Sequence, residues 1–237
     1  MRKIKVLAIC AIAVLAVSNI KAQGFSTGAD IVSSYIWRGI PQDGTSLGGT
    51  PNIQPYAAFT TGKLTLGSWA SGSFTGAVKE VDLYATLAVS SKFAITLTDY
   101  YYNFAGQPNY FKYSGGTGHV FEGTLAYTGS AFSASINTMF AGADKKVNGD
   151  NALSTYVELG YQIAPVAKIF IGGSLGESQT YATTGFGITN LGIKVSKSIA
   201  ITDKFSLPVY AIVGANPYLK STFFVAGVTL WYISSPI

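Results

Sequence analysis

The chain has 237 residues, of which only 11% are charged while 48% are hydrophobic and 14% aromatic. Roughly a quarter of the residues in ordinary soluble domains are charged, so this composition is unusual for one. Four of the 16 basic residues and the single cysteine lie in residues 1–22, and the remainder carries 12 basic against 11 acidic groups. Because residues 23–237 contain no cysteine, disulfides and Cys-ligated metal sites are excluded there. Because their basic and acidic groups nearly balance, charge-driven binding of nucleic acid is excluded as well.

The first 22 residues have the order of a secretory signal peptide. A basic start precedes an unbroken apolar run from Val6 to Val17, and Ala22 is a small residue suited to the cleavage site. The run is too short for a transmembrane helix, which needs about 20 apolar residues. Cys10 suggests a lipoprotein, but it lies inside the apolar run. We predict a signal peptide at 1–22, cleaved near Ala22, and an exported protein at 23–237.

The exported part alternates apolar and polar residues with a period of two, which is typical of strands. The clearest case has a purely aliphatic face formed by Val81, Leu83, Ala85, Leu87 and Val89. The positions between them hold Glu80, Asp82, Tyr84, Thr86 and Ala88. Such alternation predicts a strand with apolar contacts on one side and polar surroundings on the other.

Twelve segments follow this pattern, and most have the nine to eleven residues that a tilted membrane strand requires. The predicted strands are roughly 25–38, 52–61, 64–74, 79–90, 93–102, 119–127, 132–140, 151–162, 168–176, 188–197, 206–215 and 222–232. Long and short connections tend to alternate, with two exceptions, a short outer loop at 74–79 and a long inner turn at 199–205. We therefore predict an all-β fold, a transmembrane antiparallel up-and-down β-barrel of twelve strands in the outer membrane of a Gram-negative bacterium.

Aromatic residues gather at the ends of the predicted strands, as in the girdles that flank a membrane. Tyr35, Trp37, Tyr100 to Tyr102 and Phe140 mark one rim, and Tyr127, Phe132 and Tyr161 mark the other. The last strand has the Gly-x-x-apolar-x-aromatic spacing recognised by the barrel-assembly machinery, but residues 233–237 follow its final aromatic. Pro55 and Pro208 fall inside predicted strands, where each removes a ladder hydrogen bond.

The run from Asp30 to Gly39 resembles the opening of the TorF family of porin-like proteins. Glu80 to Tyr84 and Phe223 to Val228 are further matches, and the similarity extends over most of the exported part. The resemblance implies an outer-membrane barrel with a pore function. None of the shared motifs carries chemistry.

If the aliphatic faces contact lipid, the alternate residues line the lumen. A Lys or Arg on the lipid face at mid-membrane costs about 2–4 kcal/mol, so ionisable strand residues are expected inside. The lumen-lining candidates are Asp30, Arg38, Glu80, Asp82, Tyr84, Glu122, Glu158 and Lys194. Five acids against two bases predict a narrow pore for small solutes or ions with a mild preference for cations. Arg38 could instead pair with Glu80 or Asp82 and plug the barrel.

The connection 103–118 is rich in aromatic residues and glycine. We expect Tyr110, Phe111 and Tyr113 to fold into the mouth and narrow it. Alternatively, the barrel is structural or adhesive, and these rings form a binding surface. The expected partners are outer-membrane lipid, the assembly machinery and small solutes or ions, with no cofactor and no nucleic acid. The sequence leaves the oligomeric state open.

An outer-membrane hydrolase is a further alternative, since such enzymes also use barrels. The single histidine, His119, lies near Glu122 and Ser114, but no Gly-x-Ser-x-Gly motif is present. We therefore expect His119 to be a solvated loop residue and the protein not to be an enzyme. Residues 115–118 lack the Lys-Ser/Thr of a nucleotide phosphate loop, and 144–150 lack calcium-ligand spacing, so both are predicted to be plain loops.

Overall fold

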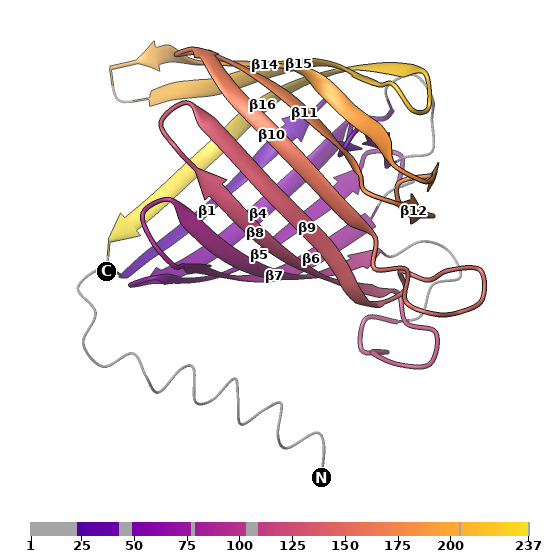
Figure 1. Cartoon of the computed structure of the whole chain (residues 1–237). Helices are drawn as coiled ribbons and strands as arrows, with labels where there is room; N and C mark the ends of the chain where they lie inside the picture. The colour runs from indigo at the N-terminus through magenta and orange to yellow at the C-terminus, as the bar shows by residue number, and fades with distance from the viewer. Residues whose placement is uncertain (1–22, 43–48, 77–78, 103–108, 204, 237) are drawn as a thin grey trace.

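The computed structural model describes residues 23–42, 49–76, 79–102, 109–203 and 205–236. Twelve antiparallel strands close into one barrel in the order β1-β16-β15-β14-β11-β10-β9-β8-β7-β6-β5-β4 (Figure 1). Each strand of the barrel pairs with the barrel strand that precedes it and with the one that follows it in the sequence, and β1 closes the ring by pairing with β16. The predicted all-β, twelve-stranded up-and-down barrel is confirmed. The predicted signal peptide lies outside the described residues.

The wall strands are β1 (Gln23–Val32), β4 (Asn52–Thr61), β5 (Leu64–Ser73), β6 (Lys79–Ala88), β7 (Phe93–Tyr102), β8 (His119–Thr128), β9 (Phe132–Gly142), β10 (Thr155–Ala164), β11 (Ala167–Ser174), β14 (Gly187–Thr202), β15 (Phe205–Asn216) and β16 (Ser221–Pro236). Two small hairpins, β2 (Ile36–Trp37) with β3 (Ile40–Pro41) and β12 (Glu177–Ser178) with β13 (Thr183–Thr184), lie in connections. Both belong to the loop end of the barrel, on the right in Figure 1. Tight turns and the carboxyl terminus form the opposite, turn end.

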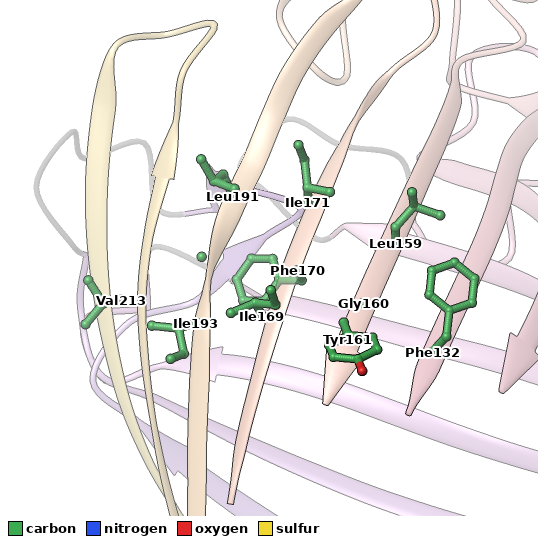
Figure 2. Close-up of a pocket in the computed structure, with 11 residues that line it drawn as sticks. Phe132, Leu159, Gly160, Tyr161, Ile169, Phe170, Ile171, Leu191, Ile193 and Val213 are labelled. Atoms are coloured by element: carbon green, nitrogen blue, oxygen red, sulfur yellow. The ribbon is translucent and has the colours of Figure 1, made fainter. Parts of the chain in front are cut away.

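The outer face of the wall is apolar. Val81, Leu83 and Leu87 are each more than 40% exposed on β6, whereas Glu80 and Asp82, which alternate with them, are buried. Figure 2 shows the same arrangement on β10, β11 and β14, where Leu159, Ile171 and Leu191 form one row and Tyr161, Ile169 and Ile193 the next. These rows border an apolar hollow of about 460 Å³ on the outer side of the wall. Within the described residues, no helix is long and apolar enough to cross a membrane, a finding that does not bear on crossing by strands.

Four predicted strand boundaries were wrong by four or more residues, one of them the start of the strand predicted at 151–162, which begins at Thr155. The first strand ends at Val32 and not at residue 38, because the chain leaves the wall there. The inner turn predicted at 199–205 is short, since β14 continues to Thr202 and β15 begins at Phe205. The segment after Tyr232 belongs to the last strand and pairs with the start of β1, so closure of the ring uses residues up to Pro236.

Both prolines lie in strands at positions where pairing is incomplete. The register between β4 and β5 is interrupted around Pro55, which faces Ala29 of β1 on its other side. Pro208 pairs only with β14, because the pairing of β15 with β16 begins at Val209. Each proline therefore occupies a site where one ladder hydrogen bond is already absent, as strand prolines require.

Several inward aromatic rings lie against a glycine of the neighbouring strand. Tyr84 covers Gly67, Phe170 covers Gly192, and Tyr210 covers Gly227. A Cβ atom at Gly192 would lie 2.6 Å from Cζ of Phe170 and 2.6 Å from the carbonyl oxygen of Val213. The ring could turn away from such an atom, but the carbonyl belongs to the next strand of the wall and could not. The sheet is therefore packed closely enough here to exclude any side chain.

We expect Gly192→Val to destabilise the barrel by about 1–3 kcal/mol, the range for overpacking a packed site. The measurement is the urea midpoint of refolded protein, with the gel shift between unheated and heated samples as a second readout. Gly72→Val is the matched control, because a Cβ at Gly72 of β5 meets no atom within 4 Å. Equal losses in the two variants would contradict the packing argument.

Candidate functional site

The β2–β3 hairpin lies inside the barrel at the loop end. Its tip is Arg38-Gly39, with φ of 52° and 80°, and two consecutive positive φ angles are what a tight type I′ hairpin turn requires. Oγ1 of Thr189 donates to the carbonyl oxygen of Arg38 at 3.2 Å, and Nδ2 of Asn216 donates to that of Gly39 at 3.2 Å. The hairpin thus extends from β1 across to β14 and β15.

The position of Gly39 leaves no space for a side chain. A Cβ atom added to it would lie 1.8 Å from the carbonyl oxygen of Thr189 and 2.7 Å from the carbonyl carbon. Both atoms belong to the backbone of β14, so neither can move aside. The hairpin tip therefore rests directly on the barrel wall, and the absence of a side chain at Gly39 permits this contact.

Arg38 forms the central contact of the hairpin with the far wall. Its Nη1 and Nη2 atoms donate to the two carboxylate oxygens of Glu122 on β8, at 2.6 and 2.8 Å. Nη1 also donates to the hydroxyl of Tyr181, and the guanidinium carbon lies 4.4 Å from the ring centre of Trp37 and 4.8 Å from that of Tyr156. Glu122 is 1% exposed and Arg38 12% exposed, so the pair is shielded from water. A bidentate pair between aromatic rings is a strong and directional contact.

The β12–β13 loop reaches the same point from the other side. Tyr181 is completely buried and stacks on Trp37, with ring centres 5.6 Å apart and an interplanar angle of 16°. Asp144 anchors this loop by accepting hydrogen bonds from Ser154 Oγ at 2.7 Å and Thr180 Oγ1 at 3.0 Å. Two loops that are far apart in the sequence therefore meet on Arg38. We call the β2–β3 hairpin with Arg38, Glu122 and Tyr181 the plug.

Burial and charge fix the protonation states of the two loop residues in the plug. Burial disfavours the charged form of Arg38, but the hydrogen bond with Glu122 outweighs this effect and the pKa of Arg38 rises above its ordinary value. Burial also raises the pKa of the Tyr181 hydroxyl. Both groups therefore keep their ordinary protonation state over the whole neutral and mildly alkaline range.

The predicted pairing of Arg38 with Glu80 or Asp82 was wrong, because the hairpin crosses the lumen to Glu122. Glu80 and Asp82 lie side by side on the inner face of β6, 1% and 5% exposed, and neither forms an ion pair within the described residues. Both oxygens of Glu80 and Oδ1 of Asp82 lack a hydrogen bond of good geometry. The inner face of β6 therefore holds two adjacent buried carboxyl groups with no basic partner in an ion pair among the described residues.

The other predicted lumen residues also face inward. Oδ1 of Asp30 accepts a hydrogen bond from Thr229 at 2.7 Å, Glu158 accepts hydrogen bonds from Tyr156 and Asn190, and Nζ of Lys194 lies 4.3 Å from the ring centre of Tyr210. Tyr84 lies over Gly67.

Lys168 is a further inward base that the sequence analysis missed. Its side chain lies over Gly160, and it alternates with the outward Ile169 and Ile171. This alternation was visible in the sequence. The described wall strands therefore contribute five acids and two bases to the lumen, and Arg38 at the hairpin tip adds a third base, which leaves a smaller acid excess than predicted.

The three rings expected to narrow the mouth do not lie in it. Tyr110 packs against Tyr101 and His119, with ring centres 5.0 and 5.1 Å apart, and Tyr113 stacks on His119 at 4.1 Å. Tyr101 of β7 pairs with His119 of β8. Because side chains alternate along a strand, both residues lie on the same outer face of the wall as the exposed Leu97 and Leu125. Phe111 is 84% exposed. The segment 109–118 thus folds over the outer side of the wall.

The expectation for His119 was also wrong. Its side chain is completely buried, Nδ1 lies 2.7 Å from Oδ1 of Asp99, and Nε2 faces the carbonyl oxygen of Tyr110. His119 and Glu122 point to opposite sides of β8, so the two residues cannot act together. Both ring nitrogens of His119 are engaged in holding the loop to the wall. Tyr35, Trp37 and Tyr100, expected in the girdle, instead lie inside the barrel.

We expect Tyr110→Ala combined with Tyr113→Ala to leave single-channel conductance unchanged, because these rings pack on the outer wall. The same change removes the rings that cover the His119–Asp99 pair, so the midpoint of thermal unfolding should fall. Conductance in planar bilayers and unfolding in detergent are the two measurements. Higher conductance in the double variant would restore the idea that this loop constricts the pore.

The fold and the plug define a class: a closed twelve-stranded antiparallel barrel with an apolar outer wall and a polar lumen that a hairpin enters from one end. Within the described residues, no group of three or more His, Cys, Asp or Glu is placed to hold a metal ion. The chain matches no family model and no curated protein.

Proposed function

We propose that the protein is a porin-like barrel of the bacterial outer membrane that passes small solutes or ions passively through a narrow lumen closed by the plug. The signal peptide predicted at 1–22 would direct export, and the barrel-assembly machinery would insert the protein. The resemblance to the TorF family agrees with this proposal. No chemical reaction is part of it.

A membrane location is supported by the outer wall. Aliphatic side chains on successive strands are about half exposed there, a pattern that would be unfavourable in water and suits hydrocarbon. The wall strands have 8 to 16 residues, enough to cross the bilayer core at a tilt. Outward Tyr127, Phe132 and Tyr161 at the turn end suit the boundary between lipid and water.

One observation supports a pore function more than any other: Arg38 of the hairpin forms a bidentate ion pair with Glu122 inside the lumen. A barrel that served only as an anchor could fill its lumen with side chains of its own wall. Here a hairpin from one strand crosses to the opposite wall and is held by an ion pair and ring contacts. Such contacts can break and re-form without unfolding the wall. The plug is therefore a removable closure, and the acid excess behind it favours cations.

The test is planar-bilayer recording of the purified, refolded exported part. We expect small, intermittent conductance steps and a reversal potential that indicates a mild cation preference. A folded barrel that gives no steps above background, or a clear anion preference, would contradict the proposal.

A further inference from the structure

A polar hollow of about 480 Å³ lies at the loop end, between residues 113–117 and 142–145. These two segments belong to neighbouring loops that project beyond the strands β7 to β10 (Figure 1). Tyr113, which lines the hollow, stacks on the outward His119, so the hollow lies on the outer side of the wall and not over the lumen. The proposed passage of ions does not involve it.

Two ammonium groups border this hollow. Lys145 is one of the lining residues, and its Nζ donates to Oδ1 of Asn151 at 2.5 Å. Nζ of Lys112 lies about 4.0 Å from the position of a Cβ on Gly116, which is also in the lining. Neither lysine forms an ion pair within the described residues. The nearby Asp150 is held by Asn148, and Asp144 faces inward to Ser154. The hollow therefore has two ammonium groups at its border that are not engaged in ion pairs, while the nearest carboxylates are turned to other partners.

Apolar surface adjoins the charged hollow. Phe140 is 45% exposed on the outer wall, and its ring lies 6.4 Å from that of Phe121. At the loop tips, Phe111 is 84% exposed and Val147 is 91% exposed, next to Lys112 and Lys146 respectively. A ligand that suits this surface has an anionic group for the hollow and hydrocarbon for the wall beside it.

We propose that this hollow binds a phosphate group of the phosphorylated glycolipid of the outer leaflet, with Lys112 and Lys145 contacting the phosphate and its acyl chains lying against the wall at Phe140. The inference rests on the proposed outer-membrane location, with the loop end of the barrel at the outer leaflet. It is independent of whether the lumen conducts. The backbone amides of the glycine-rich segment 114–117 could supply further donors to the phosphate oxygens.

The experiment measures binding of diphosphorylated lipid A to the refolded exported part in nonionic detergent, by native mass spectrometry and by titration at two salt concentrations. Lys112→Gln combined with Lys145→Gln should weaken binding by about tenfold or more, because it removes two charge-assisted contacts with phosphate. Lys63→Gln combined with Lys92→Gln is the matched control, since both lysines are exposed in turns at the opposite end. This control should bind as the unmodified protein does.

Three results would overturn the inference. Dephosphorylated lipid A could bind as tightly as the diphosphorylated form, or the two double variants could lose affinity equally, which would indicate unspecific attraction. Inorganic phosphate could displace the lipid at equal concentration, which would identify a site for a soluble anion. The same samples are recorded in bilayers. Absent conductance with retained lipid binding would refute the pore alone, whereas loss of both in folded unmodified protein would refute the membrane assignment.

Discussion

Arg38→Ala should convert the small, intermittent openings of the barrel into larger and longer ones. The substitution removes both hydrogen bonds to Glu122 and the contacts of the guanidinium with Trp37 and Tyr156. Breaking a buried ion pair by removing one partner typically costs about 3–5 kcal/mol. Without this contact the hairpin loses its attachment to β8, so the fraction of time it spends seated in the lumen should fall steeply.

The change in selectivity provides a sharper test than conductance alone. Arg38→Ala leaves the Glu122 carboxylate uncompensated, so the cation preference should increase. Glu122→Gln breaks the same pair and should open the pore as well, but it leaves the guanidinium without its acid and should shift the reversal potential toward anions. Opposite shifts with similar openings are expected only if both residues act through one contact inside the lumen.

Arg38→Lys is the conservative variant, and it should give intermediate openings because an ammonium cannot form the bidentate contact. Lys63→Gln, in a turn at the far end of the barrel, controls for the loss of a positive charge. Conductance and reversal potential are read from bilayer recordings in a salt gradient. If Arg38→Ala conducts as the unmodified protein does, the plug does not close the pore.

Gly39→Ala should release the plug by a steric route. The added Cβ would lie 1.8 Å from the Thr189 carbonyl oxygen, so the tip of the hairpin must lift off β14. A left-handed backbone also costs alanine about 1–2 kcal/mol. We expect larger openings, as for Arg38→Ala, but with no change in selectivity because no charge is altered. The measurements are again conductance and reversal potential.

Gly76→Ala is the matched control for this second prediction. Gly76 has a similar φ of 74°, but a Cβ there meets no atom within 4 Å, so the control carries the backbone strain without the clash. Combining Gly39→Ala with Arg38→Ala should open the pore no further than either change alone, since both act on one hairpin. Additive effects, or an equal response in Gly76→Ala, would refute the steric explanation.

The alternation of residues determined the fold without help from tertiary contacts. In a strand, neighbouring side chains point to opposite faces, so Val81 and Leu83 had to share one side of the wall and Glu80 and Asp82 the other. The placement of Asp30, Glu122, Glu158 and Lys194 in the lumen follows from the same local rule. The inward position of Lys168 could also have been predicted from the sequence, because Lys168 alternates just as regularly with the apolar Ile169.

The arrangement of the loops was decided only by the tertiary structure. Arg38 contacts Glu122 and Tyr181, which are 84 and 143 residues away in the sequence. The alternation of residues along a strand cannot predict contacts at such separations, because they form only when the barrel has closed. The segment 109–118 lies on the outer side of the wall because Tyr110 packs against the outward rings of His119 and Tyr101. The local sequence of the segment does not determine this side. The sequence therefore determined the wall and its two faces, because side-chain direction in a strand is local. Which loops fill the barrel and which cover it was fixed by contacts that exist only after closure.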